Sequence, residues 1–414
     1  MTEVPVFNEA ERSEAGSFDE RLNLKLESAR IWPRMDGVDL LRGLAICFVL
    51  MNHVNMQLLG AKVSYTQGLP RQLVSSLVWN GQFGVQIFFA ISGFLITSTT
   101  LRRWGSVAAV NVFDFYRLRF ARIAPLMMLL LLVLSVLHLT HVKGFVVGEK
   151  TGGLGRALAA ALTFHVNLLE ARRGYLPAGW DVLWSLSVEE AFYLCFPLVC
   201  RIFRRTNFLS ALLFVFILLG PFARSEALNH NPVWREYSYL GGMDGIALGC
   251  LTALFSAKGR LSKMKLRVAA GAGTMMLVFV LCFSISADRW GLGRSGLDMT
   301  VLGLGTCLLL AVVAQTQWKA PGFAGPLVRL GRLSYEVYLT HIFVVLSVFH
   351  LFLILNKPLR AVPGMFVVVL LLSGLLGAVV SRSYSEPMNR WLRATWVKDA
   401  TRFGSIPQGE AMSV

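Results

Sequence analysis

The chain has 414 residues, of which 55% are apolar and only 15% are charged, and its mean hydropathy is +0.58. A soluble protein of this length has no use for so many long apolar runs, so the composition indicates an all-α polytopic membrane protein. The net charge of +16 would indicate nucleic-acid binding in a soluble chain. Here, basic loops that set the orientation in the membrane explain it better, and any surplus can bind an anionic ligand.

The first segment, residues 1–35, is polar and mixed in charge. It has no short basic region leading into an apolar core, so it is not expected to be a cleaved signal peptide. We expect a flexible cytosolic tail there, a single membrane domain over residues 36–392, and a second short cytosolic tail over residues 393–414. No internal repeat and no additional soluble domain are expected.

Ten apolar stretches are long enough to cross a bilayer as helices. They cover residues 38–59, 83–101, 122–140, 184–203, 208–224, 237–256, 267–286, 297–315, 333–356 and 362–383. A shorter apolar stretch, Ala157–Leu169, lies between the third and the fourth. Basic clusters follow every second span, and they share one side only if both termini are cytosolic and the short stretch does not cross. We therefore predict ten crossings plus one short re-entrant or interfacial helix, with eleven crossings as the alternative.

The first predicted span carries an arginine near its start and a histidine deep inside. Arg42 and His53 are eleven residues apart, which places them within roughly 20° of one stripe and about 16 Å apart along the helix. Asp39 falls near the same stripe. Ionisable residues inside a span indicate function, although His53 could also be a packing residue hydrogen-bonded across helices. A basic cytosolic entrance with a deeper base in the outer half suits a long anionic ligand threaded lengthwise.

Three arginines alternate with aromatic residues before the third predicted span, in FDFYRLRFARIAP. Arg119 and Arg122 share a helix face at a spacing of three, and Arg117 precedes them. Arginines at this place are also ordinary topology signals. Guanidinium groups fit phosphate groups, so phosphate binding is the competing interpretation.

Two adjacent carboxylates enter the fourth predicted span. Ser185, Glu189 and Tyr193 share a face at spacings of four, whereas Glu190 points about 100° away from Glu189. A carboxylate at this depth can orient an imidazole, bind a sugar hydroxyl or pair with an arginine.

Aromatic residues and a second histidine complete the set of candidates. Trp180 and Trp184 are most simply interface anchors, although indoles also stack on sugar rings. In GRLSYEVYLTH, Tyr335, Tyr338 and His341 follow at steps of three. We expect His341 in the inner half of its helix, where a structural hydrogen bond is as good an explanation as catalysis. No histidine has a partner at ligand spacing, so no metal site is expected.

The motifs, taken in order, resemble the membrane-bound acyltransferase type 3 family, which includes O-antigen and exopolysaccharide O-acetyltransferases and macrolide O-acyltransferases. The matching segments are GVDLLRGLAICFVLMNH, GVQIFFAISGFLIT, FYRLRFARIAP, WSLSVEEAFYLCFP, MDGIALG and LSYEVYLTH. The resemblance covers about residues 36–392. It implies transfer of an acyl group, often acetyl, from cytosolic acyl-CoA to a hydroxyl.

The resemblance also implies roles for individual residues. Its Arg–His motif lands on Arg42 and His53, its paired-arginine motif on Arg119 and Arg122, and its recurring carboxylate on Glu189. In the catalytic hypothesis, His53 is the general base, assisted by Glu189, and the arginines bind the phosphates of acyl-CoA. Because this sequence reads RLR where many members have consecutive arginines, Arg117 and Arg119 can exchange roles. We expect substrate contacts from Trp184, Glu190, Tyr193, Tyr338 and His341.

The partners that follow are acyl-CoA as donor co-substrate, with no permanently bound cofactor, the lipid bilayer, and an acceptor that is a carbohydrate, a lipid-linked glycan or a glycosylated metabolite. Nucleic acid is not expected. The expected location is the bacterial plasma (inner) membrane, with both termini cytosolic. A transporter or flippase whose charged residues line a substrate path is the alternative function. The acceptor, the acyl length and the choice between direct transfer and an acyl-enzyme stay open.

Overall fold

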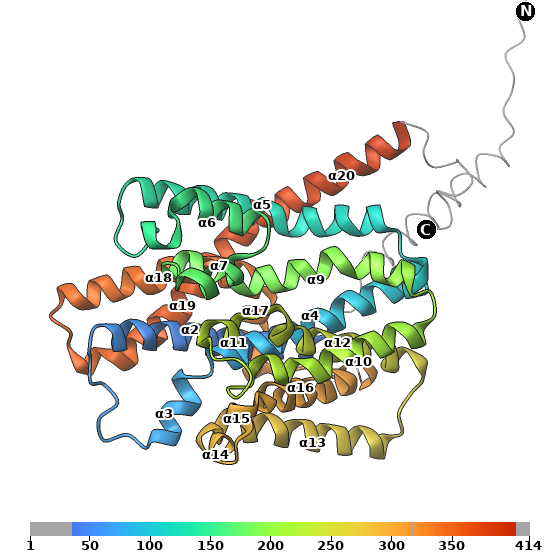
Figure 1. Cartoon of the computed structure of the whole chain (residues 1–414), viewed down its shortest axis with the longest axis horizontal. Helices are drawn as coiled ribbons and strands as arrows, with labels where there is room; N and C mark the ends of the chain where they lie inside the picture. Colours follow the sequence, from blue (N-terminus) through green and yellow to red (C-terminus); the bar gives the residue numbers. More distant parts are fainter. Residues whose placement is uncertain (1–34, 317, 403–414) are drawn as a thin grey trace, which may run out of the picture.

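The computed structural model describes residues 35–316 and 318–402, with side chains up to Trp396. This described part contains helices and no strand, and ten of its helices are long and apolar enough to cross a membrane. They run side by side along the long axis of the molecule (Figure 1). The prediction of an all-α membrane protein with about ten spans is therefore confirmed.

The spanning helices keep the predicted order. They are α2 (Asp36–Gly60), α4 (Gly81–Trp104), α5 (Val112–Leu139), α9 (Leu183–Ile202, preceded by α8, Ala178–Asp181), α10 (Thr206–Arg224), α12 (Tyr239–Lys258, preceded by α11, Pro232–Tyr237), α13 (Lys263–Cys282), α16 (Leu297–Thr316), α18 (Ser334–Ile354) and α19 (Val362–Val380). The connections hold α3 (Arg71–Val78), α14 (Ser284–Arg289), α15 (Leu292–Ser295) and α17 (Gly325–Arg332).

The third span begins at Val112 rather than at residue 122. Asn111 caps this helix, because its side-chain oxygen accepts the backbone N–H groups of Phe113 and Asp114 at 3.1 Å each. The arginine-rich segment is therefore part of α5 itself. A hydropathy pattern places the start of the span later because the polar first turns lower the average.

The short apolar stretch between the third and fourth spans folds as two helices, α6 (Gly153–Leu162) and α7 (Val166–Arg173). Phe164, between them, has a φ of +56°, which a helix cannot contain. A helix of the length of α6 reaches about 15 Å, half of the hydrocarbon core. Both helices lie at the end of the bundle where α5 finishes (Figure 1), which agrees with the predicted ten crossings.

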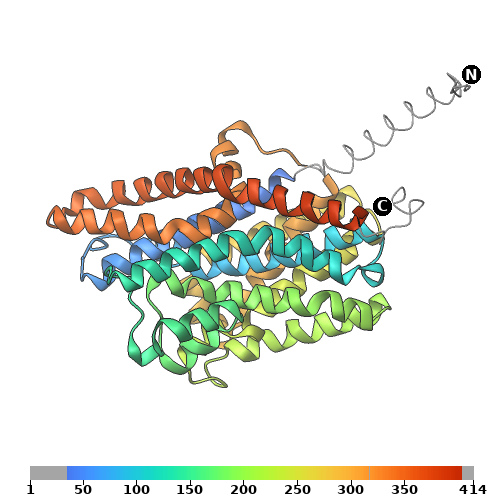
Figure 2. The ribbon, with the colours of Figure 1, turned by 90° about the horizontal axis from the view of Figure 1, so that it is seen from above.

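At the other end of the chain, α19 continues through a π-helical turn, Ser381–Ser385, into α20 (Glu386–Arg402). Figure 2 shows α20 lying beside the first half of α5. The Tyr384 hydroxyl donates to the carbonyl of Pro125 at 3.2 Å, which joins the two elements. The predicted C-terminal tail thus begins inside α20, and residues 1–34 and 403–414 of the predicted tails lie outside the described residues.

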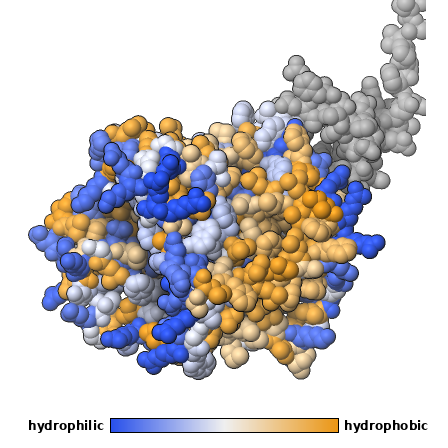
Figure 3. Space-filling model, in the orientation of Figure 1, coloured by the Kyte–Doolittle hydropathy of each residue, from blue (hydrophilic) through white to orange (hydrophobic). Residues whose placement is uncertain are grey.

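The surface carries an apolar belt between polar ends (Figure 3). Large apolar side chains of the peripheral helices are exposed, among them Leu132 of α5, Phe214 of α10, Met275 of α13 and Leu371 of α19, each more than half exposed. Soluble monomers do not present such continuous apolar surface, so lipid must cover it.

The innermost helices α4 and α12 pack closely because each has a glycine at their contact. A Cβ on Gly249 of α12 would overlap the carbonyl oxygen of Ala90 of α4, and one on Gly93 of α4 would overlap that of Ile246. Small residues at such crossings let helix backbones approach in membranes. This contact sets the position of α4, which forms one wall of the cavity described next.

Candidate functional site

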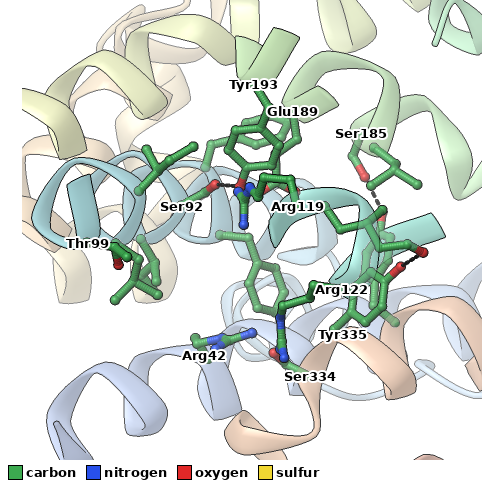
Figure 4. Close-up of a pocket in the computed structure, with 18 of the residues that line it drawn as sticks. Arg42, Ser92, Thr99, Arg119, Arg122, Ser185, Glu189, Tyr193, Ser334 and Tyr335 are labelled. Carbon is green, nitrogen blue, oxygen red and sulfur yellow. Dashed lines mark hydrogen bonds between the residues drawn. The ribbon is translucent and has the colours of Figure 1, made fainter. Parts of the chain in front are cut away.

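A cavity of about 250 Å³ lies between α2, α4, α5, α9 and α18. Most of its lining is apolar, and its polar residues come from all five helices. They are Arg42, Ser92, Thr99, Thr100, Arg119, Arg122, Ser185, Glu189, Tyr193, Ser334, Tyr335 and Tyr338. Figure 4 shows Arg42 and Arg122 reaching towards Ser334, with Arg119 beside Ser92 and Glu189. We call this space the arginine cavity.

The three arginines of the cavity have no acidic partner. In the described part of the chain, the ion pairs involve Arg224, Arg235 and Arg332, and no hydrogen bond from Arg42, Arg119 or Arg122 is formed. Arg122 is exposed at the mouth of the cavity, while the other two are half-buried. Partly buried cations without a counter-charge are costly. An anion that entered the cavity would be attracted by all three guanidinium groups.

Asp39, which shares a stripe with Arg42 in the sequence, does not neutralise it. Its carboxylate accepts Nε of Arg332 at 3.0 Å, and Asp36 binds the same guanidinium at 3.2 Å. These pairs fasten the start of α2 to α17. Gly331 of α17 packs directly on the carbonyl of Asp39, which keeps the two helices in contact. The guanidinium of Arg42 therefore lines the cavity without an ion pair to Asp39.

Glu189 lies beside Arg119 (Figure 4), at the end of a chain of two hydrogen-bonded hydroxyl groups. Tyr193 donates to Glu189, and Ser92 bonds to the same tyrosine hydroxyl. The guanidinium of Arg119 lies 3.4 Å from the centroid of the Tyr193 ring. The predicted face of Ser185, Glu189 and Tyr193 is confirmed, since all three line the cavity.

Glu190, next in the chain, lies outside the lining of the arginine cavity. It is 8% exposed, and its Oε1 has no hydrogen-bond partner. This agrees with the expected angle of about 100° between the two neighbouring side chains.

The far wall of the cavity is formed by the tyrosines of α18. The Tyr338 hydroxyl lies 2.6 Å from the Ser185 hydroxyl and donates to the carbonyl of Val182 at 3.2 Å. The Tyr335 hydroxyl donates to the carbonyl of Ile123 at 2.8 Å. These hydrogen bonds hold both rings in this structure, where Tyr338 closes the cavity on the side of the histidines.

His341 is fully buried behind Tyr338, and its tautomer follows from its contacts. Nδ1 lies 2.7 Å from the carbonyl of Tyr338 and 3.2 Å from that of Val337. A carbonyl only accepts, so Nδ1 carries the proton and Nε2 keeps a lone pair. That Nε2 is buried without a partner.

His53 lies next to His341, with ring centroids 5.0 Å apart and planes inclined by 52°. His53 lies in the second half of α2 and His341 in the first half of α18, and the two rings are neighbours all the same. Because α17 packs against the start of α2, α18 begins further inside the bundle and brings His341 to the level of His53. His53 does not line the arginine cavity. Tyr338, which does, lies between the cavity and the histidines, and its ring centroid is 5.8 Å from that of His341.

Two other predicted site residues lie outside the cavity. Arg117 covers the ring of Phe113 at 4.1 Å. Trp184 is buried and stacks on Tyr237 at 4.1 Å with nearly parallel planes. The interface-anchor interpretation of Trp184 and Trp180 is wrong, because both indoles are buried and that of Trp180 donates to the carbonyl of Phe145 at 3.2 Å. Roles of Arg117, Trp184 and Glu190 in binding stay predictions.

The sequence did not indicate the contact between the two histidines or the hydrogen bond between Ser92 and Tyr193. Neither has a local signal, because each depends on how separate helices pack. The hydrogen bond between His53 and Glu189 that their chemistry led us to expect is not formed. Among the described residues, Glu189 accepts a hydrogen bond from Tyr193 instead.

The sequence is similar to known proteins along most of its length. The family described as an acyltransferase domain matches residues 35–380. The O-acetyltransferase OatA of Staphylococcus aureus (strain NCTC 8325 / PS 47) is 22% identical over 381 residues, which are 88% of this chain and 58% of that protein. The putative O-acetyltransferase SAS0844 of Staphylococcus aureus (strain MSSA476) is 26% identical over 348 residues, 79% of this chain and 52% of that protein. The chain thus spans little more than half the length of these relatives. No solved structure matches it.

Proposed function

The chain belongs to the acyltransferase 3 family, and from this premise we propose that it transfers an acyl group, acetyl in the simplest case, from acyl-CoA to a hydroxyl of a carbohydrate or glycosylated acceptor. The observation that carries this proposal is the arginine cavity, where three guanidinium groups from two helices meet without a carboxylate partner. Acyl-CoA supplies the phosphates that such a cluster binds.

The donor enters at the exposed mouth. Arg122 meets the phosphates first, and Arg42 and Arg119 hold them further in. The rest of the lining is mostly apolar and takes the pantetheine arm. The rise from Arg42 to His53 along α2, about 16 Å, is comparable to that arm, so the thioester arrives near the histidines. Because acyl-CoA is a cytosolic donor, the proposal requires the mouth of the cavity to face the cytosol.

His53 is the general base of the proposed reaction. Its neutral imidazole takes the proton from the acceptor hydroxyl while that oxygen bonds to the thioester carbonyl carbon. The C–S bond then breaks, and the thiolate of CoA leaves and takes up the proton. Because Tyr338 lies between the cavity and the histidines, its ring moves aside when both substrates are bound.

His341 is a positioning residue for that base. Its Nε2 has a lone pair and no partner, and the His53 ring lies beside it. An N–H of His53 directed to this Nε2 leaves the other ring nitrogen of His53 as the proton acceptor. This is how enzymes commonly orient a base, through a third group.

Glu189 acts on the donor side rather than on His53. Through its bond with Tyr193 it fixes the ring on which Arg119 stacks. It also supplies one negative charge beside the arginines, which keeps the empty cavity from being strongly repulsive. Glu189 therefore holds the phosphate-binding group in position.

The proposal is tested with membranes that contain the full chain and radiolabelled acetyl-CoA. The expected result is release of free CoA and a labelled O-acyl product that mild alkali removes. Mass spectrometry of envelope glycans and secreted metabolites, with and without the protein, then identifies the acceptor by a mass change of one acyl group. Movement of a glycan across the membrane without consumption of acyl-CoA would overturn the proposal in favour of a transporter.

A further inference from the structure

Two adjoining cavities lie at the end of the bundle opposite the mouth of the arginine cavity. The first, about 340 Å³, is enclosed by the start of α4, the end of α10, α11 and the start of α16. The second, about 560 Å³, lies between residues 66–83 and the segment from α13 to α16. Asp288, Gly293 and Asp298 line both of them. We call the two together the distal groove.

Phe89 connects the distal groove with the arginine cavity, because its ring lines both the 340 Å³ cavity and the arginine cavity. The ring meets Trp184 edge-on at 6.2 Å. It also packs on Gly242, where a Cβ would come within 2.6 Å of the ring. Phe89 is therefore a point at which a ligand in the groove comes close to the site of the donor.

The floor of the groove is rigid. Arg224 and Asp244 form a buried two-pronged pair at 2.6 and 2.9 Å. Thr300 and Gln86 complete the hydrogen bonds of this carboxylate at 2.7 and 2.9 Å. Because α4, α10, α12 and α16 all contribute, the floor is held independently of any ligand.

The walls offer hydrogen-bond acceptors that lack donors. The carboxylates of Glu236 and Asp288 form no hydrogen bond or ion pair in the described chain, and Asp298 accepts only from the neighbouring Met299 N–H at 2.8 Å. Asn80 is fully buried, and its Nδ2 donates to the carbonyls of Ser76 and Leu281. Its orientation is thereby settled, and its Oδ1 is left without a partner at the wall of the second cavity.

The chemistry of these walls selects a ligand rich in hydroxyl groups. Unpaired carboxylate and amide oxygens accept O–H groups, and the half-exposed Trp79 together with Phe83 presents aromatic surface for sugar rings. Each cavity falls in the range of about 300–1,000 Å³ that takes a compact ligand, so two in series suit a chain rather than one sugar. The lining also holds arginines, so its formal charges balance and favour a neutral glycan over an anionic one; the charged residues are Arg71, Arg224, Arg235, Arg294, Glu226, Glu236, Asp288 and Asp298.

We infer that the distal groove binds a neutral oligosaccharide and presents one of its hydroxyls at Phe89. This inference rests on the proposed function, since the sugar chain would be the acyl acceptor. Donor and acceptor then approach the histidines from opposite ends of the bundle. The side chains of Phe89 and Tyr338 change position when donor and acceptor are both bound.

The test uses the purified full chain and an array of neutral oligosaccharides of one to six sugars. Two variants remove the wall chemistry, the double change of the exposed Asp288→Asn with the partly buried Asp298→Asn, and Trp79→Ala. Glu149→Gln, an exposed acid at the same end but outside the groove, is the matched control. Wild type and control are expected to bind oligosaccharides of two or more sugars, and both groove variants to bind at least tenfold more weakly.

Acetyl-CoA affinity, measured on the same samples, shows that the variants are folded. If no oligosaccharide binds to wild type, or if the groove variants keep its affinity, the inference is overturned. The outcome is separate from that of the proposed function. Oligosaccharide binding without acetyl-CoA consumption would sink the acyltransferase proposal, whereas consumption with groove variants that bind sugars normally would sink only the groove.

Discussion

At the scale of single residues, the arginine cavity separates the polar motif residues that line it from those that do not. Arg42, Arg119 and Glu189 were predictable, because spacings of three and four place residues on one helix face. The contact of His53 with His341 was not, because it depends on how far α18 is shifted along α2. The spacing of residues in the sequence tells which of them share a helix face. The relative shift of two packed helices, which decides whether residues on different helices lie at the same depth, cannot be derived from that spacing.

We predict that His53→Ala lowers acyl transfer by at least about 100-fold, because general base catalysis contributes that much or more. Acetyl-CoA affinity should stay near that of wild type, since the phosphates bind elsewhere. Single-turnover assays with labelled acetyl-CoA measure both. His350→Ala, at an exposed position, serves as the control, and retained turnover in His53→Ala would refute the general base.

His341→Ala and His341→Asn distinguish positioning from mere packing. Asn offers an oxygen that can accept the N–H of His53, whereas Ala offers none. We expect His341→Asn to keep several-fold more turnover than His341→Ala, with the KM for acetyl-CoA unchanged in both. Equal losses in kcat for the two variants would contradict a role through His53.

The neighbouring arginines of α5 should differ sharply. Arg119→Ala is expected to raise the KM for acetyl-CoA about tenfold or more, since hydrogen bonds to charged groups contribute about 1.5–3 kcal/mol. Arg117→Ala should change it little, because Arg117 lies over Phe113 outside the cavity. Acetyl-pantetheine, which lacks the nucleotide phosphates, should not distinguish wild type from Arg119→Ala. A larger effect of Arg117→Ala would reverse the assignment.

At the scale of elements, boundaries were the hardest to predict. The cap at Asn111 extends α5 by polar turns that a hydropathy pattern ignores, and the turn at Phe164 divides one apolar stretch into α6 and α7. The ten spans themselves follow from length and apolarity alone. Local backbone chemistry, which the pattern does not weigh, decides where each helix begins and ends.

The short helix α7 contains a buried carboxyl group with a clear pH signature. Glu170 is fully buried, and its Oε1 accepts the backbone N–H of Leu176 at 3.0 Å. Burial and then the charge of Asp181 hold the pKa of Glu170 well above its ordinary value, and Glu236 adds to the effect. The folded protein therefore binds this proton more tightly than the unfolded chain does. Stability should fall as the pH rises above the unfolded pKa of about 4.5.

Glu170→Gln removes this ionisation and keeps an oxygen for Leu176. We expect the variant to be more stable than wild type at pH 8, by about 1 kcal/mol or more, and closer to wild type at pH 4.5. Thermal unfolding in detergent at both pH values measures the difference. A variant less stable than wild type at pH 8 would show that the carboxyl group is favourable there.

At the scale of the whole molecule, an apolar belt between polar ends fixes the protein across a membrane (Figure 3). Which end faces the cytosol follows from the basic connections, and only a sidedness experiment tests it. We predict that a fluorescent protein fused after the last residue is fluorescent in bacteria, while alkaline phosphatase fused there is inactive. Phosphatase inserted after Lys150 should be active, and the reciprocal pattern would invert the proposed direction of donor entry.

One feature of the interior has an electrical consequence. Phe89 lines both the arginine cavity and the distal groove, which enter the bundle from opposite ends. Once water fills both spaces, the low-dielectric barrier between the two sides of the membrane is thinner than the hydrocarbon core of about 30 Å. The transmembrane voltage then drops over this shorter path, and a unit charge crossing 100 mV changes its energy by about 2.3 kcal/mol. A proton or thiolate that forms beside Phe89 would therefore feel the membrane potential, and the reaction rate would vary with it.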